Sequence, residues 1–195
     1  MKIAIFGGSF DPPHKGHMAI VQKALAMLDI DYLFVVPTYR NPLKASFNAP
    51  PKLRLKWLKK IFLAQRKVIV SDYEIKRGKP TYTLQTLQYL RKKYAPQKIY
   101  LIIGSDNLKT FHLWYRYKKL QKLAEFIVAT RRGYNVPKKY KKIFIDIPIS
   151  STSLRKNPQR RYLYPLIADE IIHFYRSLTP AKTPQSDTFA DTPLS

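Results

Sequence analysis

The chain has 195 residues, 45% of them hydrophobic, which is enough for one domain with a single sizeable core. It contains no cysteine, and this excludes disulfides, thiolate nucleophiles and cysteine-ligated metals. The formal net charge is +24, so the protein attracts polyanions such as nucleotides or nucleic acid, although basic runs are also typical of solvated helix faces. Apolar runs are too short for a membrane span or a signal sequence, and we expect a cytoplasmic protein with no membrane partner.

The first half of the chain alternates apolar strands with amphipathic helices. Residues 2–6 (KIAIF) are rich in β-forming residues and stop at a glycine pair, which predicts a buried strand. We predict a helix over residues 16–28 and a second strand over residues 31–37. A helix then begins near Pro51, where the missing N–H of proline costs least, and a third strand covers residues 67–70.

The same alternation continues to the last helix. A stripe of leucines predicts a helix over residues 82–94, and a similar apolar stripe predicts the final helix over residues 163–174. Between them we predict a strand at 98–104, a helix at 113–123, and strands at 125–130 and 142–147. Residues 179–195 contain few apolar side chains to bury, so we predict a disordered tail there and a single domain over residues 1–178.

These elements predict an α/β fold. The strands are apolar throughout rather than at alternate positions, which indicates a strand buried on both faces. We therefore expect a doubly wound, mostly parallel sheet with helices on both faces. Ligands of such sheets bind beyond the carboxyl ends of the strands, at the switch point, so the loops that follow the strands are the place to look for a site.

The loop after the first strand combines a glycine turn with two histidines at a helix start. Gly7 and Gly8 let the backbone turn sharply and let a bulky ligand approach the main chain. The helix that begins near Gly16 offers free N–H groups to an anion. His14 and His17 can share one side of its first turn and donate to one phosphate, or they can serve as local caps.

The loop after the last strand is rich in hydroxyl groups. Residues 149–155 (ISSTSLR) place Ser151, Thr152 and Arg155 at the start of a helix. Hydroxyls at this position are N-caps at the least. Arg155 lies one turn further on the same side as Ser151, so hydroxyls, backbone N–H groups and a guanidinium can together hold a triphosphate tail.

These two loops carry a family resemblance. The stretch GGSFDPPHKGH resembles the G-x-F-x-P-x-H-x-G-H signature of the nucleotidyltransferases, which have a Rossmann-like fold and transfer adenylyl or cytidylyl groups. The resemblance implies that His14 and His17 contact the nucleotide's phosphates and stabilise the pentacoordinate transition state. ISSTSLR resembles the family's I-S-S-T-x-x-R motif, implying contacts with the β- and γ-phosphates of ATP. The ATP-binding residues that we expect are Gly7, Gly8, Ser9, Phe10, His14, His17, Gly104, Asp106, Ser151, Thr152 and Arg155.

A motif in the middle of the chain narrows the choice of acceptor substrate. Residues 72–90 resemble the D-x-E-x-x-R-x-G-x-[ST]-Y-T-x-x-T-L segment of the bacterial nicotinate-nucleotide adenylyltransferases. The positions that align are Asp72, Glu74, Tyr82, Thr83, Thr86 and Leu87. Arg77 and Gly78 are adjacent here, whereas the family separates them. The resemblance implies ATP and nicotinate mononucleotide as substrates.

The acceptor is then a flat ring with a negative charge and a 5′-phosphate. Trp114 can stack on this ring, or it can pack as an ordinary core or surface residue. Backbone N–H groups at the helix start near Tyr82 and Thr83 can bind the nicotinate carboxylate, and Thr83 can also be a simple N-cap.

Other acceptor contacts follow from the resemblance alone. It brings Arg131 to the acceptor and Asp106 to the adenosine ribose, although Asp106 can instead cap the helix that follows the strand at 98–104. Lys44 matches the lysine of the family's P-P-H-K loop and can neutralise charge on the reacting phosphates. Leu43 replaces the histidine of that loop.

The predicted reaction is attack of the mononucleotide 5′-phosphate on the α-phosphorus of ATP, with release of pyrophosphate. His14, His17, Lys44 and Arg155 would supply charge and donors, and Mg²⁺ would arrive bound to ATP, without a dedicated metal site. Nicotinamide mononucleotide and phosphopantetheine are alternative acceptors. A basic nucleic-acid-binding protein is a remote alternative that rests on charge alone, and we expect no stable nucleic-acid partner. Monomer and homodimer both stay open.

Overall fold

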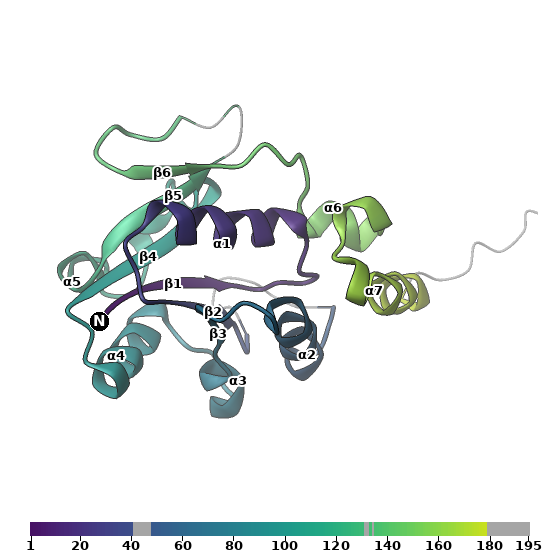
Figure 1. Cartoon of the computed structure of the whole chain (residues 1–195), viewed down its shortest axis with the longest axis horizontal. Coiled ribbons are helices and arrows are strands. Elements are labelled where there is room, and N and C mark those ends of the chain that lie inside the picture. The colour runs from purple at the N-terminus through teal and green to yellow at the C-terminus, as the bar shows by residue number, and fades with distance from the viewer. Residues whose placement is uncertain (41–47, 131–132, 134, 179–195) are drawn as a thin grey trace, which may run out of the picture.

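A single parallel sheet forms the centre of the computed structural model, which describes residues 1–40, 48–130, 133 and 135–178. Within these residues the strand order is β3-β2-β1-β4-β5-β6, and every neighbouring pair is parallel (Figure 1). The strands are β1 (Lys2–Gly8), β2 (Tyr32–Pro37), β3 (Val68–Val70), β4 (Lys98–Gly104), β5 (Glu125–Thr130) and β6 (Lys141–Phe144). The predicted doubly wound α/β fold is confirmed.

The order of the strands creates one switch point. The chain adds β2 and β3 on one side of β1, and then returns to place β4 on the other side of β1. β5 and β6 continue outward from β4. The connections that leave β1 and β4 therefore diverge to opposite sides, which opens a crevice beyond their carboxyl ends.

Helices cover both faces of this sheet. The helices are α1 (Lys15–Met27), α2 (Pro51–Phe62), α3 (Tyr73–Arg77), α4 (Thr83–Tyr94), α5 (Tyr117–Leu123), α6 (Ser151–Lys156) and α7 (Pro165–Ser177), with short 3-10 turns η1 (Ser105–Asn107), η2 (Phe111–Leu113) and η3 (Arg160–Tyr162). The apolar residues of α1, α2 and α7 join one core cluster, and those of α4 and α5 join the other. Among the described residues, no helix has the length and apolar content needed to cross a bilayer.

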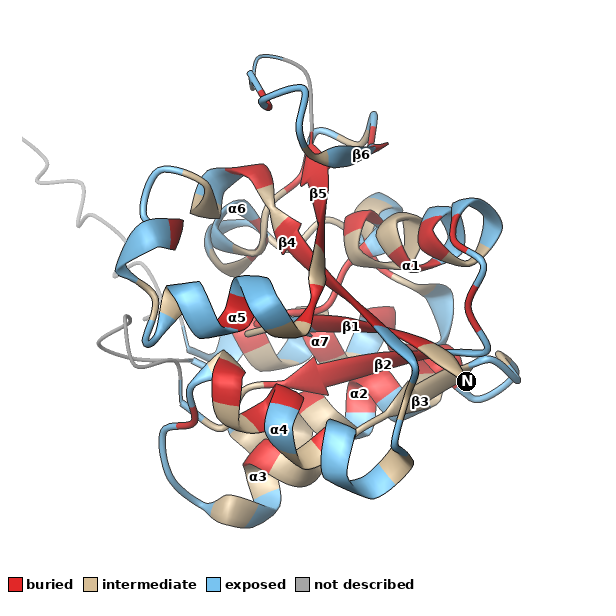
Figure 2. Cartoon of the chain, turned by 90° about the vertical axis from the view of Figure 1, so that its left-hand side faces the viewer, coloured by how far each residue is buried: buried red, intermediate tan, exposed pale blue. Residues whose placement is uncertain are grey.

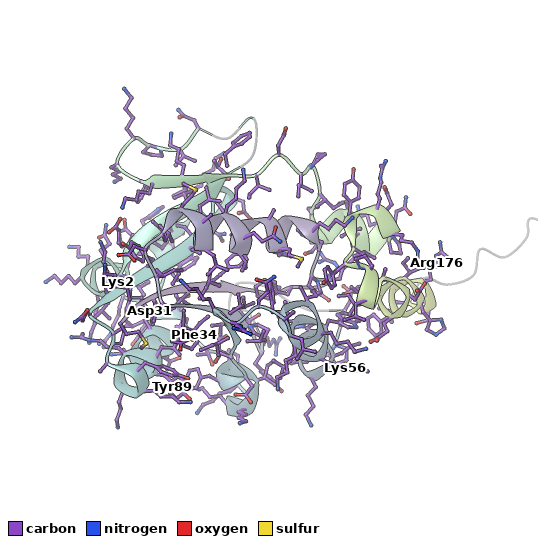
Figure 3. The ribbon with its side chains drawn as sticks, in the orientation of Figure 1. Lys2, Asp31, Phe34, Lys56, Tyr89 and Arg176 are labelled. Carbon is purple, nitrogen blue, oxygen red and sulfur yellow. The ribbon has the colours of Figure 1, made fainter. Side chains whose placement is uncertain are left out.

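Successive residues of each central strand feed these two clusters in turn. In β1, Ala4 and Phe6 belong to the cluster under α1, whereas Ile3 and Ile5 belong to the cluster under α4. The central strands β1, β2, β4 and β5 are buried along most of their length, while the outer faces of the helices are exposed (Figure 2). Phe34 of β2 lies inside, on the same side of the sheet as Tyr89 of α4 (Figure 3). Burial on both faces explains why the interior positions of the central strands are apolar without alternation.

Several predicted boundaries were wrong. The first strand does not stop at residue 6 with a sharp turn at the glycine pair, because Gly7 and Gly8 continue β1 and pair with Val36 and Pro37 of β2. The predicted helix 113–123 begins only at Tyr117, because Arg116 has a φ of 52° and cannot lie inside an α-helix. The predicted strand 142–147 ends at Phe144, because Phe144 pairs with Thr130, the last residue of the neighbouring strand. The single-turn helix α3 was not predicted at all.

The final helix is also shifted from its prediction. It covers Pro165–Ser177 rather than residues 163–174, with the proline in its first turn, so Leu163 packs before the helix starts. Its buried face ends on Tyr175, which the predicted stripe did not include. The predicted tail, residues 179–195, lies outside the described residues.

Candidate active site

A cavity of about 640 Å³ opens beyond the carboxyl ends of β1, β2, β4 and β5, at the switch point. Its volume is within the range of small-molecule sites. Every predicted site residue that the structure describes lines it: Gly7, Gly8, Ser9, Phe10, His14, His17, Tyr82, Thr83, Gly104, Asp106, Trp114, Ser151, Thr152 and Arg155. Lys44 and Arg131 lie outside the described residues.

Phe10 shapes the loop that carries the histidines. Its φ of 51° is a left-handed conformation, uncommon for a residue with a bulky side chain. The buried ring packs edge-on against Phe6 and His17, with centroids 5.4 and 4.9 Å away. A Cβ at Gly8 would lie 3.2 Å from this ring, so the absence of a side chain at Gly8 lets the ring pack against the backbone. Phe10 thus packs against the His17 ring and helps to hold it in place.

His14 and His17 stack at the start of α1. Their ring centroids are 3.7 Å apart with planes inclined by 24°. His14 is the N-cap residue, and its backbone N–H donates to Nδ1 of His17 at 3.2 Å. Because Nδ1 accepts, a neutral His17 carries its proton on Nε2, which makes Nε2 the hydrogen-bond donor. The predicted placement of both rings on one side of the helix start is what the structure has.

The start of α6 lies beside the histidine loop (Figure 1). Ser150 is the N-cap, and its hydroxyl accepts from the backbone N–H of Ser153 at 3.1 Å. The hydroxyls of Ser151 and Thr152 are therefore not used as the helix cap. Ser151 donates to the Pro12 carbonyl oxygen at 3.0 Å, and Arg155 donates to the hydroxyl of Thr152, also at 3.0 Å. Ser151 and Arg155 therefore bind the first loop directly, and Thr152 binds Arg155.

Asp11 joins this loop to three distant parts of the chain. Its buried carboxylate accepts from the backbone N–H groups of Asn48 and Ala49 at 3.1 and 2.9 Å, and from the Tyr175 hydroxyl at 2.5 Å. Its carbonyl oxygen accepts from Arg155 at 2.8 Å. Burial beside this carboxylate raises the pKa of Tyr175 well above its ordinary value, so the hydroxyl remains a donor. Neither Asp11 nor Tyr175 was predicted as a site residue.

Arg54 supports the same region from α2. Its fully buried guanidinium donates to four carbonyl oxygens, those of Ser9, Thr38, Tyr39 and Ala49. Burial lowers the pKa of Arg54 from its ordinary value. Arg54 was also missed, because a basic residue in an amphipathic helix is normally solvated. Its contacts join the loop after β1 to the segment after β2.

Three aromatic residues from the start of α4 and the segment before α5 also line the cavity: Tyr82, Trp114 and Tyr115. Trp114 packs edge-on against Phe111 with centroids 5.0 Å apart, and its Nε1 is buried with no hydrogen-bond partner in the described part of the chain. Trp114 is thus anchored in the core and also lines the cavity. Tyr82 and Tyr115 stack with centroids 4.6 Å apart, and each is 43% exposed. Tyr115 was not predicted as a site residue.

The start of α4 differs from its prediction. Tyr82 is the N-cap and Thr83 is the first helical residue, so Thr83 is not a cap. The Tyr82 N–H donates to Oε1 of Gln85 at 3.0 Å and is therefore engaged within the chain. The N–H groups of Gln85 and Thr86 donate to the Tyr82 carbonyl oxygen, which leaves those of Thr83 and Leu84 at the N-terminal end of the helix, where a helix has no partner of its own for them.

Asp106 lies in η1, directly after β4. Gly104, not Asp106, is the N-cap residue of this turn, so the alternative that Asp106 caps it is wrong. A Cβ on Gly104 would collide with Oδ1 of Asp106. Glycine at the end of β4 therefore lets the Asp106 carboxylate fold back over the strand end.

Glu74 is a buried acid in the cavity wall. It lies on α3, is 4% exposed, and its Oε1 accepts from the Thr86 hydroxyl at 2.6 Å. Burial raises the pKa of Glu74 to about 7, and the Thr86 hydrogen bond and the charges of Arg77 and Arg54 counter this only in part. Among titratable groups that line the cavity, Glu74 can thus change charge near neutral pH.

The sequence is similar to proteins of known name. Residues 5–157 match the family described as cytidylyltransferase-like. A protein of a Nitratiruptor species named "Probable nicotinate-nucleotide adenylyltransferase" is 63% identical over 177 residues, which are 91% of this chain and 100% of that protein. A protein of the same name from Aliarcobacter butzleri is 47% identical, over 89% of this chain and 96% of that protein.

Solved structures are similar in fold as well. Nicotinic acid mononucleotide adenylyltransferase from Plasmodium falciparum, complexed with NaAD, superposes with a TM-score of 0.73 at 26% identity. The alignment covers 90% of this chain and 97% of that one. The same Plasmodium enzyme complexed with APC gives a TM-score of 0.66 with the same coverage.

Proposed function

This chain belongs to the nicotinate-nucleotide adenylyltransferases, within the cytidylyltransferase-like family, and we propose that it transfers the adenylyl group of ATP to the 5′-phosphate of nicotinate mononucleotide. The products are nicotinate adenine dinucleotide and pyrophosphate, and the reaction is a step of NAD biosynthesis. The observation that carries the proposal is the 63% identity to a relative of that name over 91% of the chain. The histidine pair at the mouth of α1 supplies the matching chemistry.

The reaction needs positioning and positive charge rather than a protein nucleophile. An oxygen of the acceptor 5′-phosphate forms a bond to the α-phosphorus of ATP, while the bond from that phosphorus to the bridging oxygen breaks and pyrophosphate leaves. Negative charge develops on the transferred group, where fixed donors are most effective. His14 and His17 are the donors that we assign to this group.

The two ends of the cavity suit two different substrates. In this proposal Gly7 and Gly8 at the end of β1, Asp106 and the start of α6 form the ATP end, supported by hydroxyls, a guanidinium and two helix starts around one cavity. Trp114 and the start of α4 form the acceptor end, supported by an anchored aromatic wall. Lys44 and Arg131 keep the roles that the family resemblance implies as predictions.

Magnesium enters this proposal as part of the substrate, bound to ATP. Mg²⁺ is commonly held by one or two carboxylates together with substrate phosphates. In the described residues no group of three or more His, Asp or Glu could hold a metal. A cytoplasmic location, no stable nucleic-acid or membrane partner, and the choice between monomer and homodimer stay predictions.

Labelled ATP tests the proposed bond change. With nicotinate mononucleotide present, label in the α-phosphate should appear in the dinucleotide and label in the γ-phosphate in pyrophosphate. Label from the γ-phosphate in the acceptor product would instead indicate a kinase and refute the assignment. The matched control is His17→Ala, which should abolish most of the transfer of the α-label.

A further inference from the structure

Glu74 connects two helices that meet at the acceptor end of the cavity. It lies in α3, and Thr86 lies in the first turn and a half of α4, whose start we assign to the acceptor. Their side chains are both buried and both line the cavity. The 2.6 Å hydrogen bond from the Thr86 hydroxyl to Oε1 is thus a tie between α3 and the helix that faces the acceptor.

The second oxygen of Glu74 is incompatible with a stable negative charge. Oε2 is buried and has no hydrogen-bond partner among the described residues. A buried carboxylate normally needs several donors or a paired cation. As a neutral acid, Glu74 accepts the Thr86 hydrogen bond through Oε1 and avoids the cost of a buried charge.

The nearby cations are already engaged elsewhere. Arg77, on α3, donates to the Tyr73 hydroxyl at 3.0 Å and lies against the Tyr73 ring. Arg54, on α2, donates to four backbone carbonyl oxygens. From α4, the group that faces Glu74 is the neutral hydroxyl of Thr86. These surroundings agree with the raised pKa of about 7 for Glu74.

We propose that Glu74 is a positioning residue that tunes acceptor specificity: uncharged, it holds α4 in place through Thr86, and when ionised it weakens binding of an acidic acceptor. This inference rests on the proposed function. Nicotinate mononucleotide carries both a carboxylate and a phosphate, so a negative charge in the wall of its pocket opposes it. The amide form lacks the ring carboxylate and should be opposed less.

The test is the KM of each substrate between pH 6 and pH 8.5, measured for the wild type and for Glu74→Gln. The glutamine keeps the shape and the acceptor for Thr86 but cannot ionise. The substrates and every other side chain are the same in both measurements, so the difference between the two proteins isolates Glu74. As the pH is raised through this range, the KM of nicotinate mononucleotide for the wild type should increase on the order of tenfold more than the KM for Glu74→Gln. The KM of ATP should change equally in both.

Equal pH profiles for the two proteins would overturn the inference. An equal rise for the acid and amide acceptors would overturn the part on specificity. Absence of product from the wild type at every pH would instead refute the proposed function. Should Glu74→Gln fail to fold, Thr86→Val with Thr86→Ser as its control gives the second test. Loss of the hydroxyl in the valine variant should raise the KM of the acceptor but not of ATP, and unchanged acceptor KM would overturn the inference.

Discussion

Replacing Tyr175 by phenylalanine removes one hydroxyl group from α7 and leaves the ring in the core. Tyr175 is 2% exposed, and its hydroxyl donates at 2.5 Å to Oδ1 of Asp11, which is 2% exposed as well. The two residues are 164 positions apart in the chain. This single bond therefore links the last described helix to the loop that carries the histidines.

The expected loss can be estimated from the remaining partners of Asp11. A hydrogen bond to a charged group contributes about 1.5–3 kcal/mol. Asp11 keeps the N–H groups of Asn48 and Ala49, and a guanidinium nitrogen of Arg155 lies 3.9 Å away. The carboxylate therefore still has hydrogen-bond donors and a nearby positive charge in the variant. We expect a loss of about 2 kcal/mol in the free energy of unfolding. For a chain of this size that lowers the Tm by roughly 4–8 °C.

Urea and thermal unfolding measure this loss, with Tyr32→Phe as the matched control because Tyr32 is 39% exposed. The kcat of Tyr175→Phe should also fall, since Asp11 fixes the loop beside His14. A Tm within about 1 °C of the control variant, with unchanged kcat, would refute the reasoning that Asp11 depends on this hydroxyl.

Four further changes test other parts of the site. His17→Ala should lower kcat by about 10²–10³-fold with little change in stability, and near-normal turnover would remove His17 from the transition state. Trp114→Ala should raise the KM of the mononucleotide on the order of tenfold more than that of ATP, whereas equal effects would place Trp114 outside the acceptor pocket. Gly104→Ala should push aside the Asp106 carboxylate and raise the KM of ATP at an almost unchanged Tm; an unchanged KM would contradict a role for Asp106 in ATP binding. Glu74→Gln should alter the pH dependence of stability, because the pKa of Glu74 is raised from 4.5 to about 7 in the folded protein. The folded wild type keeps a proton that the unfolded chain releases, so between about pH 4.5 and 7 it loses stability relative to the variant, by about 3 kcal/mol in total. Parallel stability curves would show that Glu74 is not held neutral.

The fold was predictable where local pattern and environment agree. The apolar run at residues 2–6 predicted the position of β1, because a strand buried on both faces leaves a clear signal. The glycine pair misled the prediction of its end, because Gly7 and Gly8 extend the strand instead of turning the chain. Residue spacing also put His14 and His17 on one side of a helix start. The positive φ of Arg116 is not indicated by any residue pattern, so the predicted start of α5 was wrong.

The supporting contacts of the site were less predictable. The bond between Tyr175 and Asp11 depends on tertiary structure, and nothing near either residue in the sequence indicates it. Arg54 resembles any basic residue of an amphipathic helix until its four carbonyl partners are known. Glu74 aligned with a family motif, but the rise of its pKa depends on burial, which spacing cannot give.

The most direct measurement is pyrophosphate release from Mg²⁺·ATP with nicotinate mononucleotide, beside the same reaction with nicotinamide mononucleotide. We predict release with a strong preference for the acid, because the acceptor end of the cavity offers helix N–H groups and the Trp114 wall to an anionic ring. Equal rates with acid and amide would contradict the assigned acceptor. Release with neither would contradict the proposed function.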